Sequence, residues 1–340
     1  MVISNEELWR TQTEGRLRIK KSMFVASLGL FSTLVLGVAY VTQPLIPKSG
    51  NLSLGTVDPS WLRIHVRTLS EKLSPRDESH PQNLDLVAEY IRQEFEKTSG
   101  RVTEQPFSVR GETYKNIIVQ FGPETGERVV VGAHYDTAGP RPGADDNASG
   151  VAGLIELAKL LNRQTIPLCI ELVAYTLEEP PNFRTPEMGS AVLAASLKRE
   201  GVRVRAMFSL EMIGYFDDTA DSQSYPSPLL SSFYPSRGNF IAVVGNLGEG
   251  LLVRRIKGAM IRASTLPVRS INAPAMISGI DFSDHLNYWN QGYPAVMITD
   301  TAFYRNHAYH SSEDTASKLD YRRMAMVVVD VFNAVAVVSR

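Results

Sequence analysis

The hydrophobic positions from residue 58 onward alternate between short continuous runs and stripes with helical spacing. Runs of strand length occupy 101–109, 114–121, 129–133, 168–175, 202–210, 240–244 and 293–298. Helical spacing follows Asp58-Pro59 and recurs at 84–95, 148–161, 189–199, 251–264 and after Asp314-Thr315, which we expect to cap a long final helix. This alternation predicts one α/β domain whose mixed, mostly parallel central sheet carries helices on both faces.

The N-terminal segment has a different pattern. Residues 1–21 are polar and include several arginines and lysines, whereas residues 22–47 contain no charged side chain. The apolar stretch 23–41 has about the 20 residues that a membrane-spanning helix needs. We therefore expect a leader at 1–21, a transmembrane anchor at 22–42, a linker at 43–57 and the folded domain at 58–340.

The basic residues precede the apolar stretch, so the positive-inside rule places the N-terminus in the cytoplasm and the domain on the other side of the membrane. The domain would then be periplasmic or extracellular. The alternative is a signal peptide with secretion after cleavage, because Gly37 and Ala39 form a small-x-small pair.

Composition narrows the range of functions. The net charge is −1, so no basic surface argues for nucleic acid as a partner. Cys169 is the one cysteine, which excludes a disulfide within the chain, and its apolar neighbours predict a core position. Composition does not indicate an oligomeric state.

Histidines and carboxylates follow several of the predicted strands. His134 directly follows one predicted strand, and the Gly- and Pro-rich loop beyond it leads to Asp145 and Asp146 before the next helix. The carboxyl ends of strands in an open α/β sheet converge on one crevice. We therefore expect this set to meet there: His134, Asp146, Glu178, Glu179, Glu211 and His310.

Nitrogen and oxygen ligands without thiolate favour zinc, with cobalt or manganese as alternatives. One metal ion needs three protein ligands, whereas two ions that share a bridging carboxylate need about five. The set supplies five ligands and a spare carboxylate, Glu178, suited to a general base. Asp145 or Asn147 is expected to cap the helix that follows.

Short motifs extend this pattern over most of the chain. In order they are GAHYDT at 132–137, GADDNASG at 143–150, Glu-Glu at 178–179, Gly-Ser at 189–190, LEMIGY at 210–215, SDH at 283–285, GYPA at 292–295 and YHSSEDT at 309–315. In this order they resemble the co-catalytic dizinc aminopeptidases centred on bacterial leucyl aminopeptidases. Glutamate carboxypeptidase and glutaminyl cyclase are relatives of that family.

The resemblance implies a metal ligand at each of five positions. His134 would bind the first metal ion, and Asp146 would bridge both ions. Glu179 and His310 would bind the second ion. Glu211 stands where the family usually has an aspartate ligand of the first ion. Because this side chain is one methylene longer, a site for one metal ion stays open as an alternative.

The resemblance also implies catalytic roles. Glu178 would take a proton from the attacking water and pass it to the leaving amine. Asp136 would hold the far nitrogen of His134, and Tyr309 would hydrogen-bond the developing oxyanion. The segment 180–188 is longer than the family's usual link and would narrow the site. Arg305 would meet either a substrate carboxylate or a surface acid.

These features together predict a zinc-dependent exopeptidase, most simply an aminopeptidase acting on peptides. Three alternatives stay open. They are a mononuclear glutaminyl cyclase, a carboxypeptidase, and an inactive relative that binds a partner.

Overall fold

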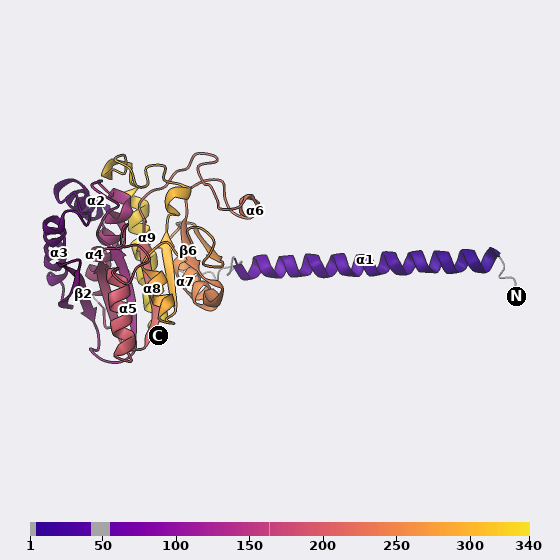
Figure 1. Cartoon of the computed structure of the whole chain (residues 1–340), viewed down its shortest axis with the longest axis horizontal. Coiled ribbons are helices and arrows are strands. Elements are labelled where there is room, and N and C mark those ends of the chain that lie inside the picture. The colour runs from indigo at the N-terminus through magenta and orange to yellow at the C-terminus, as the bar shows by residue number, and fades with distance from the viewer. Residues whose placement is uncertain (1–4, 42–54, 163) are drawn as a thin grey trace.

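An eight-stranded sheet forms the centre of the main domain in the computed structural model, which describes residues 5–41, 55–162 and 164–340 (Figure 1). Its spatial order is β1-β2-β4-β3-β5-β8-β6-β7. The strands are β1 Arg101–Val109, β2 Glu112–Phe121, β3 Arg128–His134, β4 Cys169–Tyr175, β5 Val204–Glu211, β6 Ile241–Gly245, β7 Val268–Asn272 and β8 Ala295–Thr299.

The sheet is mixed, as predicted. Strands β4, β3, β5 and β8 run parallel in its middle. The β1–β2 hairpin joins antiparallel at one side, and β6 runs antiparallel to β8 at the other. The sequence did not predict β7, which is a five-residue edge strand parallel to β6. Its short run alternates buried and more exposed positions, so it lacks the continuous apolar pattern of the central strands.

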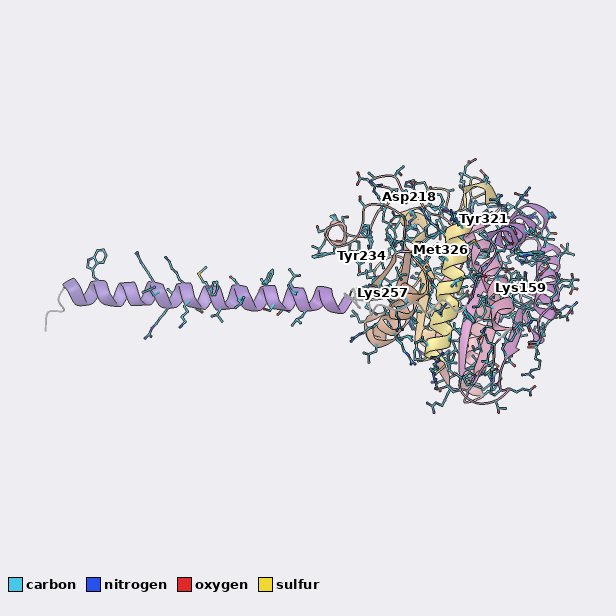
Figure 2. All side chains as sticks on the ribbon, turned by 180° about the vertical axis from the view of Figure 1, so that it is seen from behind. Lys159, Asp218, Tyr234, Lys257, Tyr321 and Met326 are labelled. Atoms are coloured by element: carbon cyan, nitrogen blue, oxygen red, sulfur yellow. The ribbon has the colours of Figure 1, made fainter. Side chains whose placement is uncertain are left out.

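Helices cover both faces of the sheet, and β3 shows how the sequence specifies this. Val129 and Val131 pack into a core formed with α2 Pro59–Arg67, α3 Pro81–Glu96, α4 Gly150–Leu161, α7 Gly250–Ala263 and α9 Tyr321–Val338. Val130, between them, faces the opposite core with α5 Gly189–Arg199 and α8 His285–Asn290. Successive side chains of a strand point to opposite faces, so a strand covered on both sides is apolar throughout. Figure 2 shows the first face, with Met326 on α9 and Lys257 on α7.

The final helix begins later than the sequence predicted. Helix α9 starts at Tyr321, and the carboxylate of Asp320 caps it by accepting hydrogen bonds from the amides of Arg322 and Arg323. The expected Asp314-Thr315 cap is therefore wrong. A short 3-10 turn, Ala316–Lys318, lies between, and the Asp314 carboxylate has other partners described below. Helix α6, Pro228–Ser231, is a single turn within the long connection between β5 and β6.

The N-terminal segment forms one long helix, α1 Asn5–Val41, which projects from the domain (Figure 1). Leader and apolar stretch are thus continuous. Within it, the 22 residues Arg16–Gly37 are long and apolar enough to cross a membrane, by length and composition alone. A signal sequence would pass the same test. Most of the predicted linker 43–57 lies outside the described residues, which omit 42–54.

Candidate metal centre and active site

The parallel strands bring the predicted site residues to one end of the sheet. His134 and Glu211 are the last residues of β3 and β5, and Glu178-Glu179 follow β4 after two residues. Asp146 lies in the irregular turn Ala144–Ser149 that leads into α4, and His310 lies in the loop beyond β8. The structure therefore brings together the five predicted metal ligands and Glu178.

Asp146 lies between the two histidines. Its Oδ1 is 3.4 Å from Nε2 of His134, and its Oδ2 is 3.1 Å from Nε2 of His310. Glu211 approaches His134 Nε2 at 3.3 Å, and Glu179 approaches His310 Nε2 at 3.2 Å. Each oxygen of Asp146 thus faces its own histidine–glutamate pair, which is the arrangement that a bridging carboxylate requires.

The donor set fits a divalent metal ion. One ligand atom each from His134, Asp146 and Glu179 lie within 4.8 Å of one another, and all three side chains are buried. Imidazole and carboxylate donors suit zinc and related ions, which have the charge needed to balance clustered carboxylates. Buried like charges at such distances would otherwise oppose one another strongly.

The electrostatics reflect this crowding. Burial, aided by the neighbouring Asp146, raises the pKa of Glu179 to about 7. Burial also raises the pKa of Glu178 well above its usual range. Burial lowers the pKa of His310, but its hydrogen bonds to Asp146 and Glu179 outweigh this effect and raise the value to about 10. Burial raises the pKa of Asp146, but the two histidines outweigh it and lower the value. Positive charge is therefore favoured at the centre of this acidic cluster.

Unusual backbone conformations flank the site residues. Leu177, directly before Glu178, has φ of 58°, and Met212, directly after Glu211, has φ of 52°. His310 itself has φ of 52°. Side-chain-bearing residues seldom adopt this left-handed region, and such conformations concentrate at functional sites. The chain therefore turns sharply where each of these side chains enters the site.

Asp136 holds the Glu178-Glu179 segment as well as lying close to His134. Its Oδ1 accepts the amide of Glu178 at 3.1 Å, and its Oδ2 accepts the amide of Glu179 at 3.0 Å. Nδ1 of His134 is 3.2 Å from the Asp136 carbonyl oxygen and 3.6 Å from its Oδ1. The hydrogen bond to His134 therefore involves the main chain, while the carboxylate orients the two glutamates.

The Asp314 carboxylate holds the main chain at Asp145 and Asp146. Its Oδ2 accepts the amides of Asp145 and Asp146 at 3.1 and 3.0 Å, and its Oδ1 accepts that of Asp145 at 3.0 Å. Asn147 accepts the amide of Gly150 at 3.1 Å, so it is the residue that caps the start of α4. Sequence reasoning missed the role of Asp314, although the YHSSEDT motif contained it.

Ser283 is a second residue that the sequence did not assign. Its hydroxyl donates to Oε2 of Glu211 at 2.7 Å and exchanges a hydrogen bond with Ser209 at 2.8 Å. The SDH motif marked this position without a role. His285 of the same motif is fully buried against Trp289.

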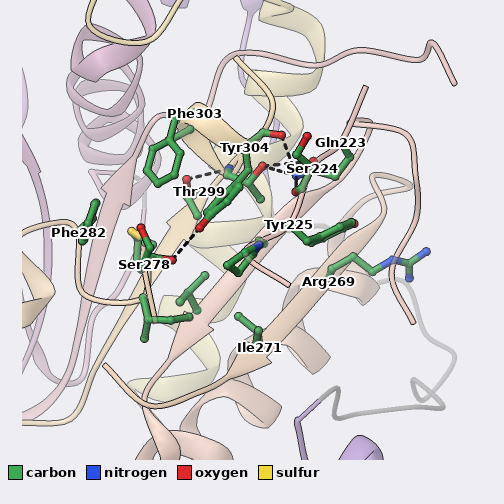
Figure 3. Close-up of a pocket in the computed structure, with 18 of the residues that line it drawn as sticks. Gln223, Ser224, Tyr225, Arg269, Ile271, Ser278, Phe282, Thr299, Phe303 and Tyr304 are labelled. Carbon is green, nitrogen blue, oxygen red and sulfur yellow. Dashed lines mark hydrogen bonds between the residues drawn. The ribbon is translucent and has the colours of Figure 1, made fainter. Parts of the chain in front are cut away.

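Tyr309 joins the metal centre to a neighbouring pocket. Its ring stacks on that of His310 at 3.8 Å, and burial raises the pKa of its hydroxyl above the usual range. The pocket holds about 810 Å³, including the solvent at its mouth, and both Glu211 and Tyr309 line it. Figure 3 shows Phe282 and Phe303 at one end of the pocket and Tyr225 and Arg269 at the other.

Arg305 is buried and no ion pair with a surface acid is found for it among the described residues, so that alternative is wrong, whereas contact with a substrate carboxylate stays a prediction. The side chain is 1% exposed, and its guanidinium donates to the carbonyls of Tyr215 and Phe240 and to the Gln223 side chain. It connects Tyr215, Gln223 and Phe240, which are far apart in the sequence. The polar sequence around Arg305 gave no sign of such burial.

Comparison with known proteins agrees with this fold. The model of peptidase family M28 matches residues 116–335, so the chain belongs to this family and is a hydrolase of the peptidase class. The uncharacterized Escherichia coli K12 protein YfbL is 51% identical over 278 residues, covering 79% of this chain and 85% of that protein.

Solved structures share the fold at low identity. The zinc aminopeptidase BSAP from Bacillus subtilis superimposes with a TM-score of 0.65 at 15% identity, covering 82% of this chain and 94% of that one. Fimbriiglobus ruber glutaminyl cyclase gives a TM-score of 0.64 at 20% identity, covering 88% and 99%. The predicted resemblance to the dizinc aminopeptidase-like family is confirmed, and the fold accommodates both activities.

Proposed function

We propose that the protein is a zinc-dependent aminopeptidase with two metal sites. One would be formed by His134, Asp146 and Glu211, and the other by Asp146, Glu179 and His310. The observation that carries the proposal is that the two oxygens of Asp146 face two different histidines, at 3.4 and 3.1 Å. A carboxylate serving a single ion has no need for this arrangement.

Zinc held here would lower the pKa of a coordinated water and polarise the scissile carbonyl. Glu178 would accept the proton. The support is that its Oε2 lies 3.9 Å from His134 Nε2, close to the proposed ligands but beyond hydrogen-bond distance from that histidine. Its raised pKa suits a group that gains a proton and then donates it to the leaving amine. The hydroxyl of Tyr309 would donate to the oxyanion as negative charge develops.

The pocket supports cleavage at the N-terminus of a peptide. Its walls are largely apolar and aromatic, so they suit an apolar N-terminal side chain, while the free amine would meet the acidic cluster. Glu211 and Tyr309 belong both to the metal centre and to the pocket wall. The scissile carbonyl would therefore lie between the two regions.

A substrate panel with metal analysis tests this function. The full chain, purified in detergent and supplied with zinc, would be assayed for bound metal and for hydrolysis of aminoacyl reporters. Parallel assays would offer peptides with N-terminal glutamine and peptides blocked at the N-terminus. We expect about two zinc ions per chain and cleavage of free N-termini alone. Cyclisation of N-terminal glutamine with one bound ion would instead favour a glutaminyl cyclase, and cleavage of blocked peptides a carboxypeptidase.

We also propose that α1 anchors the domain on the non-cytoplasmic side of the membrane. The support is the apolar segment Arg16–Gly37 and the basic residues at and before its start. Membrane fractionation combined with protease treatment of intact cells tests this placement. Recovery of a shortened chain in the soluble fraction would show that the segment is a cleaved signal.

A further inference from the structure

The segment 180–188 packs against one wall of the apolar pocket. Nη2 of Arg184 donates to both carboxylate oxygens of Asp281, each at 2.6 Å. The same guanidinium lies over the rings of Phe183 and Phe282, 5.3 and 5.2 Å from their centroids. These two rings meet edge to face at 5.8 Å. We call this set of four side chains the Arg184 clasp.

The clasp connects to the metal centre through a series of rings. Phe282 contacts Phe303 at 6.0 Å, and Phe303 contacts Tyr309 at 5.5 Å. Tyr309 stacks on His310, the candidate metal ligand. Phe282, Phe303 and Tyr309 all line the pocket, and Figure 3 shows the first two at the same end. The position of Phe282 therefore shapes the pocket next to the reacting groups.

The contacts of Arg184 are stronger than an ordinary surface ion pair. The side chain is 47% exposed, and an isolated pair at that exposure contributes little. Here the planar guanidinium reaches both oxygens of a largely buried carboxylate while it covers two aromatic rings. Phe282 follows Asp281 directly in the chain, so holding Asp281 also restrains the ring.

The segment does not depend on Arg184 for its fold. The main-chain amide of Arg184 contacts Sδ of Met188 at 3.2 Å, and hydrogen bonds from Asn182 to Glu179 and from Thr185 to Asn182 close its turns. On its other side, Arg110 donates to Glu187 at 2.9 Å and also to Asn182. Arg110 is thus a matched control, because it holds the same segment without lining the pocket.

We propose that Arg184 is a specificity-determining, positioning residue that selects large aromatic N-terminal side chains. It does so by holding Phe282 in place as a preformed pocket wall. The inference rests on the aminopeptidase function proposed above. An N-terminal phenylalanine ring would pack against Phe282 and Phe303, whereas the methyl group of alanine would not reach them.

Without the Arg184 clasp, the Phe282 ring would be mobile in the free enzyme and would become ordered only when a substrate binds. Ordering one side chain on binding weakens affinity by about 3- to 10-fold. This loss of affinity affects substrates whose N-terminal side chain packs against Phe282, so it should raise KM for phenylalanyl reporters. It should leave kcat and the kinetics of alanyl reporters within about two-fold, because the metal ligands and Glu178 are unchanged.

The test compares Arg184→Gln, Asp281→Asn, the double variant and the control Arg110→Gln in the full-length zinc-loaded protein. We expect each single clasp variant to lower the phenylalanyl-to-alanyl ratio of kcat/KM by about 3- to 10-fold through KM. The double variant should lose no more than one single variant, because both remove the same contact. Arg110→Gln should match the parent.

A second readout does not need turnover. Binding of L-phenylalanine hydroxamate and L-alanine hydroxamate would be measured by calorimetry in each variant, and the ratio of the two Kd values should change in the same way. If the parent cleaves no aminoacyl reporter, the proposed function is wrong, while this ratio still tests the clasp. An unchanged ratio in Arg184→Gln, an equal loss with both probes, or the same change in Arg110→Gln would overturn the proposal.

Discussion

Ser283 donates a hydrogen bond at 2.7 Å to Oε2 of Glu211, a candidate metal ligand. This contact restrains the Glu211 carboxylate. Residues that orient a metal ligand typically contribute about 10- to 100-fold to metal affinity or activity. We therefore expect Ser283→Ala to weaken zinc binding by about that factor, as measured by competition with a chelator.

Ser209→Ala provides the control for this change. Its hydroxyl contacts Ser283 at 2.8 Å, and no hydrogen bond to Glu211 is found for it among the described residues. The effect on zinc affinity should be smaller than that of Ser283→Ala. Equal affinities for the parent and Ser283→Ala would show that Glu211 is not a ligand that this contact orients.

Substitutions of the neighbouring residues Glu178 and Glu179 should have different effects. Glu178→Gln should retain bound metal but lower kcat by about 10²- to 10⁴-fold, because it removes the proton acceptor. Glu179→Gln should lose bound metal, because it removes a ligand. Metal content by emission spectroscopy, measured beside kcat, distinguishes the two. Parental activity in Glu178→Gln would refute the base assignment.

Asp314 should matter for stability as well as for metal binding. Asp314→Ala leaves the buried amides of Asp145 and Asp146 without an acceptor, and each unpaired amide costs about 1–3 kcal/mol. Denaturant titration would measure the loss in the free energy of unfolding. Glu313→Ala is the neighbouring control, since that side chain is 74% exposed and should change stability by less than about 0.5 kcal/mol.

The buried carboxylate of Asp330 should make the free energy of unfolding depend on pH, independently of the candidate metal centre. It is fully buried on α9, where Ser264 donates to its Oδ2 at 3.0 Å, and burial raises its pKa to about 8. In the unfolded chain the pKa is about 4. Its stabilising contribution is therefore complete below about pH 4 and is lost as the pH rises through 8.

Asp330→Asn removes this titration. The stability of the variant relative to the parent should rise from pH 4 to pH 8, by at most about 1.4 kcal/mol per pH unit, and then level off. Thermal unfolding of both proteins across this range, at one zinc concentration, measures the difference. A constant difference would show that Asp330 is already ionised in the folded protein.

Much of the fold followed from the sequence because the central strands are buried on both faces. Continuous apolar runs such as 129–133 have one dominant interpretation when Gly-rich turns and helical stripes flank them. The sequence did not predict strand β7 or helix α8, because both are short and carry no such pattern. The mistaken cap at Asp314 arose because an aspartate before a helix looks the same whether it accepts helix amides or those of a distant loop.

The candidate ligands could be predicted because their place after strands is a property of local sequence. The hydrogen bonds that hold these ligands in position could not be predicted. Asp314 and Asp146 are 168 residues apart, and Ser283 and Glu211 are 72 apart, so no local pattern connects either pair. The roles assigned to the ligands and to Glu178 stay predictions, and the experiments above address them.

The candidate metal ligands and most of the pocket walls come from different parts of the sheet. His134 and Glu211 end the central strands, whereas much of the pocket is built on β6, β7 and the loops around them. Mutations in these outer strands can therefore accumulate while the hydrolytic apparatus is inherited intact. Substrate preference can in this way change during evolution while the reaction stays the same.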